Sequence, residues 1–362
     1  MSKFGWNRRS ATSATVTIVV AGALVLGGVV PAQALDSSDI SDPTATLAVI
    51  APELLAETST EAPVDIEKPL GDDAAIVSVG TAKATDESTS GALDGSGGGV
   101  RFSIEYATET VSVDSGITVV ASQSADVNAY VQPTASGVRV LTAINSATAP
   151  THYDYHFDVP ADTKLVEGAG VSYLESGDHV LGTISEPWAI DSAGRKLPTS
   201  YSWNDGVLTQ NVDLSAPDLE FPVLADPAWS YAYTYAVTKT AAQAKSLLKR
   251  CFNCYFPVDG APRGFPVANQ LLPLHVGPGN FECRFKREIT STNYFGFQFD
   301  ATKNHVDGYG SNVVFEFKLV GGNKRLVVSA YIVNDSWWLH NGAYEQGALT
   351  NWRNFASNIS AG

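Results

Sequence analysis

Phe295-Gly296-Phe297-Gln298-Phe299-Asp300 decides the fold of the last third of the chain, because aromatic residues occupy every second position. Side chains alternate between the two faces of a strand, so the three phenylalanines share one face. The same alternation over residues 281–286 and 313–319 predicts two further strands, each with an apolar face on a core. Gly321-Gly322-Asn323 predicts a hairpin turn into a strand over residues 325–332. The pattern favours an antiparallel sheet.

Two helices are predicted to flank this sheet. Residues 239–250 place Ala242, Leu247 and Leu248 on an apolar stripe, and Thr238 or Thr240 provides the amino-terminal cap. Residues 344–355 predict a closing helix. We therefore expect a smaller α+β domain over residues 227–362.

Residues 99–226 form short alternating runs separated by turn residues, which predicts an all-β domain. Only 17% of the residues are charged, and the chain contains 31 glycines and 18 prolines, a composition that suits strands and turns. The expected fold class is mainly β, an amino-terminal all-β domain followed by the α+β domain.

Residues 35–98 differ from both domains. They contain 13 acidic and 2 basic residues and no aromatic residue. Such a segment buries too little apolar surface to offset the entropy lost on ordering. We expect a disordered acidic linker or pro-region, in which the apolar residues 47–55 form at most a short transient helix.

The amino terminus has the pattern of a secretory signal peptide. Lys3, Arg8 and Arg9 precede an uncharged apolar run over residues 16–30, and Ala32-Gln33-Ala34 predicts cleavage after Ala34. A helix of this run spans only about 22 Å, short of the roughly 30 Å hydrocarbon core of a membrane. The sequence predicts a secreted, extracellular protein without stable membrane insertion.

Charge is divided unevenly between the two predicted domains. Residues 100–226 carry 17 acidic and 5 basic residues, a net charge of −12, whereas residues 227–362 carry 13 basic and 8 acidic residues, a net charge of +5. A basic domain attracts anionic polymers. The acidic part is also expected to fold back over the basic domain and mask it until proteolysis removes the acidic part.

A resemblance to known proteins rests on four stretches of the sequence, residues 187–194, 198–201, 208–210 and 221–227. They resemble the acidic β-rich region that precedes varied carboxyl-terminal domains in secreted proteins of high-GC Gram-positive bacteria, some of which contain YD-repeat arrays. The resemblance covers roughly residues 127–229. It implies that the acidic domain presents the domain that follows, and that the latter carries the activity.

Cys251, Cys254 and Cys283 are the only cysteines, and export favours a disulfide. We expect a structural bridge from Cys254 to Cys283, with Cys251 as the alternative partner. A redox pair of Cys251 and Cys254 is disfavoured, because the pair follows the carboxyl end of a helix. The spacing of cysteines and histidines does not indicate a zinc site, and the sequence predicts no cofactor.

His305 and Asp307 lie in a loop between two predicted strands, near Arg284, Lys286 and Arg287 if those strands are neighbours. A histidine and a carboxylate so placed can act as general acid and base on a phosphodiester. The alternative is an ordinary turn, in which polar side chains and glycines satisfy the local backbone.

Two further groups of side chains have a binding and a structural interpretation. His152, Asp154, His156 and Asp158 share one face of a predicted strand, but a strand spreads them over about 13 Å, so all four cannot bind one metal ion. A solvated face is expected there. Trp337 and Trp338 would stack on sugars or bases if exposed, or would pack in the core.

Three functions remain open from the sequence alone. The first is a secreted binding module whose basic domain attaches to an anionic wall polymer or nucleic acid through Arg284, Lys286, Arg287, Trp337 and Trp338. The second is a toxin-like antibacterial enzyme of the nuclease type that uses His305 and Asp307. The third is a structural envelope protein. The common hydrolase signatures are absent, which slightly favours the first, whereas a presentation domain followed by a distinct carboxyl-terminal domain favours the second.

Overall fold

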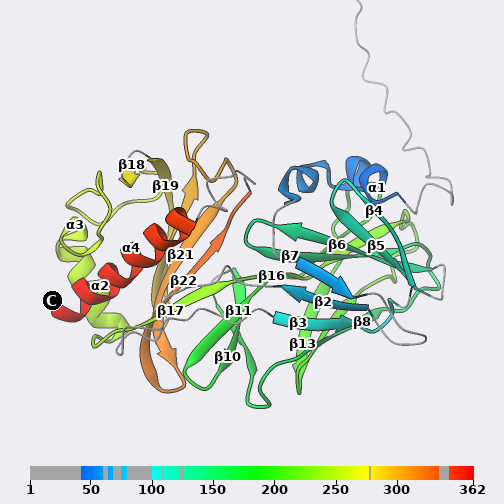
Figure 1. The fold of residues 1–362 in the computed structure, drawn as a ribbon, viewed down its shortest axis with the longest axis horizontal. Coiled ribbons are helices and arrows are strands. Elements are labelled where there is room, and N and C mark those ends of the chain that lie inside the picture. The colour runs from blue at the N-terminus through cyan, green and yellow to red at the C-terminus, as the bar shows by residue number, and fades with distance from the viewer. Residues whose placement is uncertain are drawn as a thin grey trace, which may run out of the picture. The chain divides into compact units, whose positions relative to one another are not determined.

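The computed structural model describes residues 42–59, 64–67, 75–79, 100–107, 109–122, 126–168, 170–276, 279–333 and 342–362. Strands predominate in this part of the chain, and they form three antiparallel sheets (Figure 1). The prediction of a mainly β protein with a few helices is confirmed. The predicted signal peptide lies outside the described residues. Among the residues that are described, no helix has the length and apolar character needed to cross a membrane.

Two sheets build the amino-terminal domain, and we name them sheet A and sheet B. Sheet A has the order β1-β2-β3-β8-β14-β13. Its strands are β1 (Val64–Glu67), β2 (Ala75–Val79), β3 (Val100–Ile104), β8 (His152–Phe157), β14 (Val207–Val212) and β13 (Thr199–Asn204). Sheet B has the order β4-β5-β6-β7-β16-β11-β10-β9, and β15 pairs with both β7 and β12. Its strands are β4 (Glu109–Asp114), β5 (Ile117–Ala121), β6 (Val127–Thr134), β7 (Gly137–Ile144), β16 (Ala228–Ser230), β11 (His179–Ser185), β10 (Val171–Ser176), β9 (Lys164–Glu167), β15 (Val223–Asp226) and β12 (Trp188–Ile190).

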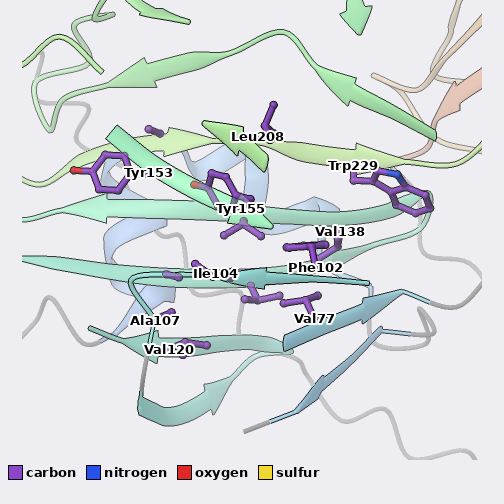
Figure 2. Close-up of a cluster of buried hydrophobic side chains, with 14 of the residues drawn as sticks. Val77, Phe102, Ile104, Ala107, Val120, Val138, Tyr153, Tyr155, Leu208 and Trp229 are labelled. Atoms are coloured by element: carbon purple, nitrogen blue, oxygen red, sulfur yellow. The ribbon is translucent and has the colours of Figure 1, made fainter. Parts of the chain in front are cut away.

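The main core of this domain lies between sheets A and B. Tyr153 and Tyr155 alternate along β8 with polar residues and are almost fully buried. They belong to one apolar cluster with Phe102 of β3 and with Val138 and Trp229 of sheet B (Figure 2). Because one sheet contributes to each side of the cluster, the domain is a two-layer sandwich.

A helical segment covers the outer face of sheet B. It consists of α1 (Pro43–Ile50) and the 3-10 helix η1 (Pro52–Glu57), and Asp42 caps α1 by accepting the backbone N–H groups of Thr44 and Ala45. Leu47, Ile50 and Leu54 are buried against Tyr130 and Leu141 of the sheet.

The expectation of a disordered linker over residues 35–98 is therefore wrong for residues 42–59. It is also wrong for β1 and β2, which pair with each other, while β2 pairs with β3. The apolar residues between 47 and 54 are few, but they are gathered on one side, and their burial offsets the cost of ordering this short segment.

Arg139 of β7 joins three parts of the molecule on this outer face. Its guanidinium donates to Asp226 (2.9 Å), to Glu57 of η1 (2.5 Å) and to the Tyr331 hydroxyl of the carboxyl-terminal sheet (3.1 Å). All of these groups lie in a largely buried environment. A buried cation so completely paired fixes the position of each partner.

The third sheet, sheet C, forms the carboxyl-terminal domain with the order β17-β22-β21-β20-β19-β18. Its strands are β17 (Ala232–Ala236), β22 (Asn323–Tyr331), β21 (Asn312–Val320), β20 (Phe295–Ala301), β19 (Gly279–Thr290) and β18 (Leu271–Val276). The predicted hairpin joins β21 to β22, and both Gly321 and Gly322 have positive φ. Phe295, Phe297 and Phe299 are buried on one face, as the alternation predicts.

Helices α2 (Ala241–Arg250), α3 (Phe252–Tyr255) and α4 (Gly342–Ala361) lie on this aromatic face (Figure 1). The two predicted flanking helices are confirmed. Thr240 caps α2 in a capping box with Gln243, and α4 continues beyond its predicted end.

The boundary between the two domains lies at one residue. β16 ends at Ser230 in sheet B, and β17 begins at Ala232 in sheet C. Tyr231 stands between them, and its backbone N–H donates to the carbonyl of Ser136. β16 follows the predicted boundary at residues 226 and 227, and it still pairs with β7 and β11 of sheet B.

Candidate functional site: the open face of sheet C

Three basic residues lie next to one another on the face of sheet C that is turned away from the helices. Alternation along β19 buries Cys283 and Phe285 on the helix side and exposes Arg284 and Lys286 on the other. The pairing register with β20 shifts between Phe285 and Arg287, so Arg287 follows Lys286 on the same exposed face. We call Arg284, Lys286 and Arg287 the basic strip.

Each side chain of the basic strip has a polar neighbour on the surface. The Lys286 ammonium lies 2.9 Å from the Asp300 carboxylate, and the Arg287 guanidinium donates to the side-chain oxygen of Gln298. The Arg284 guanidinium donates to the Asn269 carbonyl. The Lys286 side chain remains 56% exposed. An exposed pair of this kind contributes about 1 kcal/mol or less and gives way readily to a competing anion.

The amino-terminal domain covers the rest of this face of sheet C. Lys318 of β21 lies 2.6 Å from Glu175 of β10 and 4.2 Å from the centre of the Tyr173 ring. Arg325 of β22 lies 2.5 Å from Asp178 in the turn after β10. The cations of the covered half are thus matched by carboxylates of the sandwich, whereas the basic strip is not covered.

Arg287 lies at the border between the covered and the open half. Its guanidinium lies against Gly170, in the turn between β9 and β10. A Cβ atom added to this glycine would have Arg287 as its nearest neighbour. Glu186 is the next nearest side chain there. The sandwich therefore forms one edge of the open face, and this edge carries a carboxylate.

His305 and Asp307 are satisfied within their own loop. The Nδ1 atom of His305 accepts the backbone N–H of Asp307 at 3.0 Å, and the Asp307 carbonyl accepts the Ser311 hydroxyl. The two side chains are only 8% and 13% exposed, and the imidazole packs edge-on against Phe281. Burial lowers the pKa of His305, although the nearby Asp307 carboxylate opposes the shift.

A neutral, buried imidazole with Nδ1 already engaged corresponds to the turn interpretation of this loop. Glu282 of β19 supports it by accepting hydrogen bonds from Thr302 and Asn304, which lowers the pKa of Glu282. The structure therefore places His305 and Asp307 at the beginning of β19, where they hold the loop, and the basic strip further along the same strand.

The cysteine pairing differs from the prediction. Cys251 and Cys254 form the disulfide, and Cys283 is a free, buried thiol. Cys251 ends α2 and Cys254 lies in the next helical turn, so their side chains meet locally, with Cα atoms 5.3 Å apart. Cys283 instead occupies a core position of β19 among phenylalanines. The predicted bridge to Cys283 is wrong.

The remaining predicted binding residues, Trp337 and Trp338, lie outside the described part of the chain. Gln298 and Asp300 were not predicted, although the alternation that buries the phenylalanines of β20 places both on the face of the basic strip. The sequence around Lys318 and Arg325 does not indicate that the sandwich covers them, because this depends on contacts between distant parts of the chain.

No protein-family model, curated protein or solved structure matches this chain. The interpretation of the site rests on its geometry and charge.

Proposed function

We propose that this protein is a secreted binding module that attaches to an anionic extracellular or cell-wall polymer through the basic strip. The observation that supports this proposal is the grouping of Arg284, Lys286 and Arg287 on the uncovered half of sheet C. Carboxylates of Asp300, Glu186 and Glu282 lie beside the strip, but the domain that carries it is basic as a whole. Phosphate groups at regular spacing along a polymer fit such a row.

The acidic sandwich would serve as the presentation domain that its resemblance implies. Its carboxylates match the cations on one half of sheet C and leave the other half open for the ligand. The signal-peptide pattern supports secretion. The contacts of Glu175 and Asp178 agree with masking of one half of sheet C, but masking does not extend to the basic strip.

A toxin-like nuclease is the second candidate, since its residues His305 and Asp307 are adjacent in the structure. Their burial, and the use of Nδ1 within the loop, favour the binding module. The third candidate, a structural envelope protein, predicts neither binding that is sensitive to salt nor turnover.

The test compares two triple variants of equal charge. Arg284→Gln/Lys286→Gln/Arg287→Gln removes the basic strip, and Arg101→Gln/Lys164→Gln/Lys196→Gln removes three exposed cations of the sandwich. Affinity for purified wall teichoic acid and for RNA is measured between 50 and 200 mM salt. We expect the strip variant alone to lose at least about tenfold in affinity and to show a smaller dependence on salt.

Equal losses in the two variants would contradict the proposal, because net charge and not the strip would then govern binding. Degradation of RNA that is absent in His305→Ala would instead identify the nuclease. Absence of both binding and degradation would leave the structural protein.

A further inference from the structure

Three side chains with metal-binding atoms meet on the outer surface of sheet A. They are Glu105, which follows β3, and Asp154 and His156 of β8. One ligating atom from each lies within 4.8 Å of the other two, and the Nε2 atom of His156 is 3.3 Å from a Glu105 carboxylate oxygen. None of the three takes part in the basic strip.

The pairing of two strands produces this cluster. Asp154 and His156 share a face of β8 because they are two positions apart, which separates their Cα atoms by about 7 Å. In the neighbouring strand Ser103 pairs with His156 and Ile104 with Tyr155, and the backbone N–H of Glu105 donates to the Asp154 carbonyl. The third ligand thus comes from another strand, and the sequence of β8 alone does not indicate it.

The distances suit one metal ion after small movements of the side chains. Bonds of about 2 Å from an ion to nitrogen and oxygen ligands in tetrahedral geometry place two ligands about 3.3 Å apart. The three side chains therefore have to approach by up to about 1.5 Å. The Glu105 and His156 side chains are 62% and 46% exposed, so they can turn without disturbing the core.

Asp154 is already oriented. One of its carboxylate oxygens accepts the hydroxyl of Thr209 on the adjacent strand β14 at 2.5 Å. Hydrogen bonds of this kind hold a ligating carboxylate in place and strengthen metal binding. The second oxygen of Asp154 is then available to an ion.

We propose that Glu105, Asp154 and His156 form a surface site for a divalent metal ion of the Zn²⁺ class. Two carboxylates supply negative charge, and an imidazole nitrogen favours Zn²⁺ and similar ions over Ca²⁺ and Mg²⁺, which prefer oxygen ligands. Because the site lies at the surface, the remaining coordination positions face solvent and are open to water or to a ligand from a partner.

The experiment titrates the purified protein with ZnCl₂ in an isothermal calorimeter, alongside His156→Ala and Glu105→Gln. His152→Ala removes an imidazole from the same face of β8, and Asp158→Asn removes a nearby exposed carboxylate, so both serve as matched controls. We expect one Zn²⁺ site that weakens at least tenfold in His156→Ala and Glu105→Gln and is unchanged in the controls. Circular dichroism verifies that each variant is folded.

Two results would overturn the proposal. One is the absence of Zn²⁺ binding, or binding that His156→Ala leaves unchanged. The other is a Ca²⁺ affinity equal to that for Zn²⁺, because an oxygen-only site would not use the imidazole. A direct readout is the NMR signal of the His156 ring, which should shift on addition of Zn²⁺ while that of His152 stays in place.

Discussion

At the scale of single residues, His305 shows how burial changes the chemistry available to a side chain. An imidazole on an exposed loop could exchange protons with a ligand. Here the ring packs on Phe281, and its Nδ1 atom accepts a backbone N–H of the same loop. Both contacts favour the neutral ring, which makes His305 a contributor to stability that depends on pH.

The direction of this dependence follows from the lowered pKa of His305. The unfolded chain takes up the proton near pH 6.5, whereas the folded protein takes it up only at a lower pH. The stabilisation is therefore complete above pH 6.5 and is lost as the pH falls toward the folded pKa. We expect the free energy of unfolding in urea to decline less between pH 7.5 and pH 5 in His305→Gln than in the wild type. Equal declines in the two proteins would contradict this role.

The thiol of Cys283 gives a second prediction at this scale. Burial raises its pKa to about 12, and the side chain is almost inaccessible. Since only the thiolate reacts with alkylating agents, iodoacetamide should modify Cys283 only after denaturation. Peptide mapping of the non-reduced protein should recover Cys251 linked to Cys254. Rapid alkylation of Cys283 in the native protein would show that β19 is not packed as described.

At the scale of elements, a strand or helix is predicted well when the spacing of its apolar residues shows which of its faces is buried. The phenylalanines of β20 alternate strictly, and their strand, face and core were all predicted. Leu319 has the same alternation but is 55% exposed, because it lies near the end of β21 beyond the helices. Glu316 and Lys318 alternate with the apolar residues of β21, yet both are buried under the sandwich, which the local pattern cannot reveal.

The segment α1–η1 departs most from the prediction made from its sequence. Its acidic surroundings resemble a disordered region in composition, although Leu47, Ile50 and Leu54 are enough to anchor it to sheet B. The candidate site was likewise predicted only in part. Alternation identified the basic strip, whereas the approach of Glu105 to His156 depends on strand pairing, for which no local signal exists.

A matched pair of substitutions tests whether α1 belongs to the folded domain. Leu47 is fully buried, and Val49 of the same helix is 54% exposed. We expect Leu47→Ala to lower the free energy of unfolding by about 2–5 kcal/mol, through lost burial and a residual cavity. Val49→Ala should change it by about 0.5 kcal/mol or less. Urea denaturation that gives equal small effects would indicate that α1 does not contribute to the fold.

At the scale of the whole molecule, the two domains share a buried contact of mixed character. Tyr173 and Val180 of the sandwich pack with Val320 and Val327 of sheet C, and two ion pairs flank them. Gly321 is pressed so closely against the backbone of Gly177 that a Cβ atom would collide with the Gly177 carbonyl oxygen. The two hairpin turns thus fit together only with glycine at residue 321.

Breaking the more buried ion pair should weaken both domains together. Lys318→Ala leaves the Glu175 carboxylate without its cation in a setting where both side chains are nearly inaccessible. We expect a loss of about 3 kcal/mol in the free energy of unfolding, measured by calorimetry. Lys324→Ala, which removes an exposed lysine of the neighbouring strand, should cost about 1 kcal/mol or less. Similar losses in the two variants would contradict the contact.

The junction at Tyr231 has a consequence for maturation. Proteases cut peptides that can enter their active site in extended form, and they need several residues free of other contacts. Between Ser230 and Ala232 there is only Tyr231, and its backbone N–H is bonded to the carbonyl of Ser136. A cut at this point has to wait until a strand detaches from its sheet. We therefore expect this junction to resist proteolysis, contrary to removal of the acidic part by a cut here, so that a ligand meets both domains together.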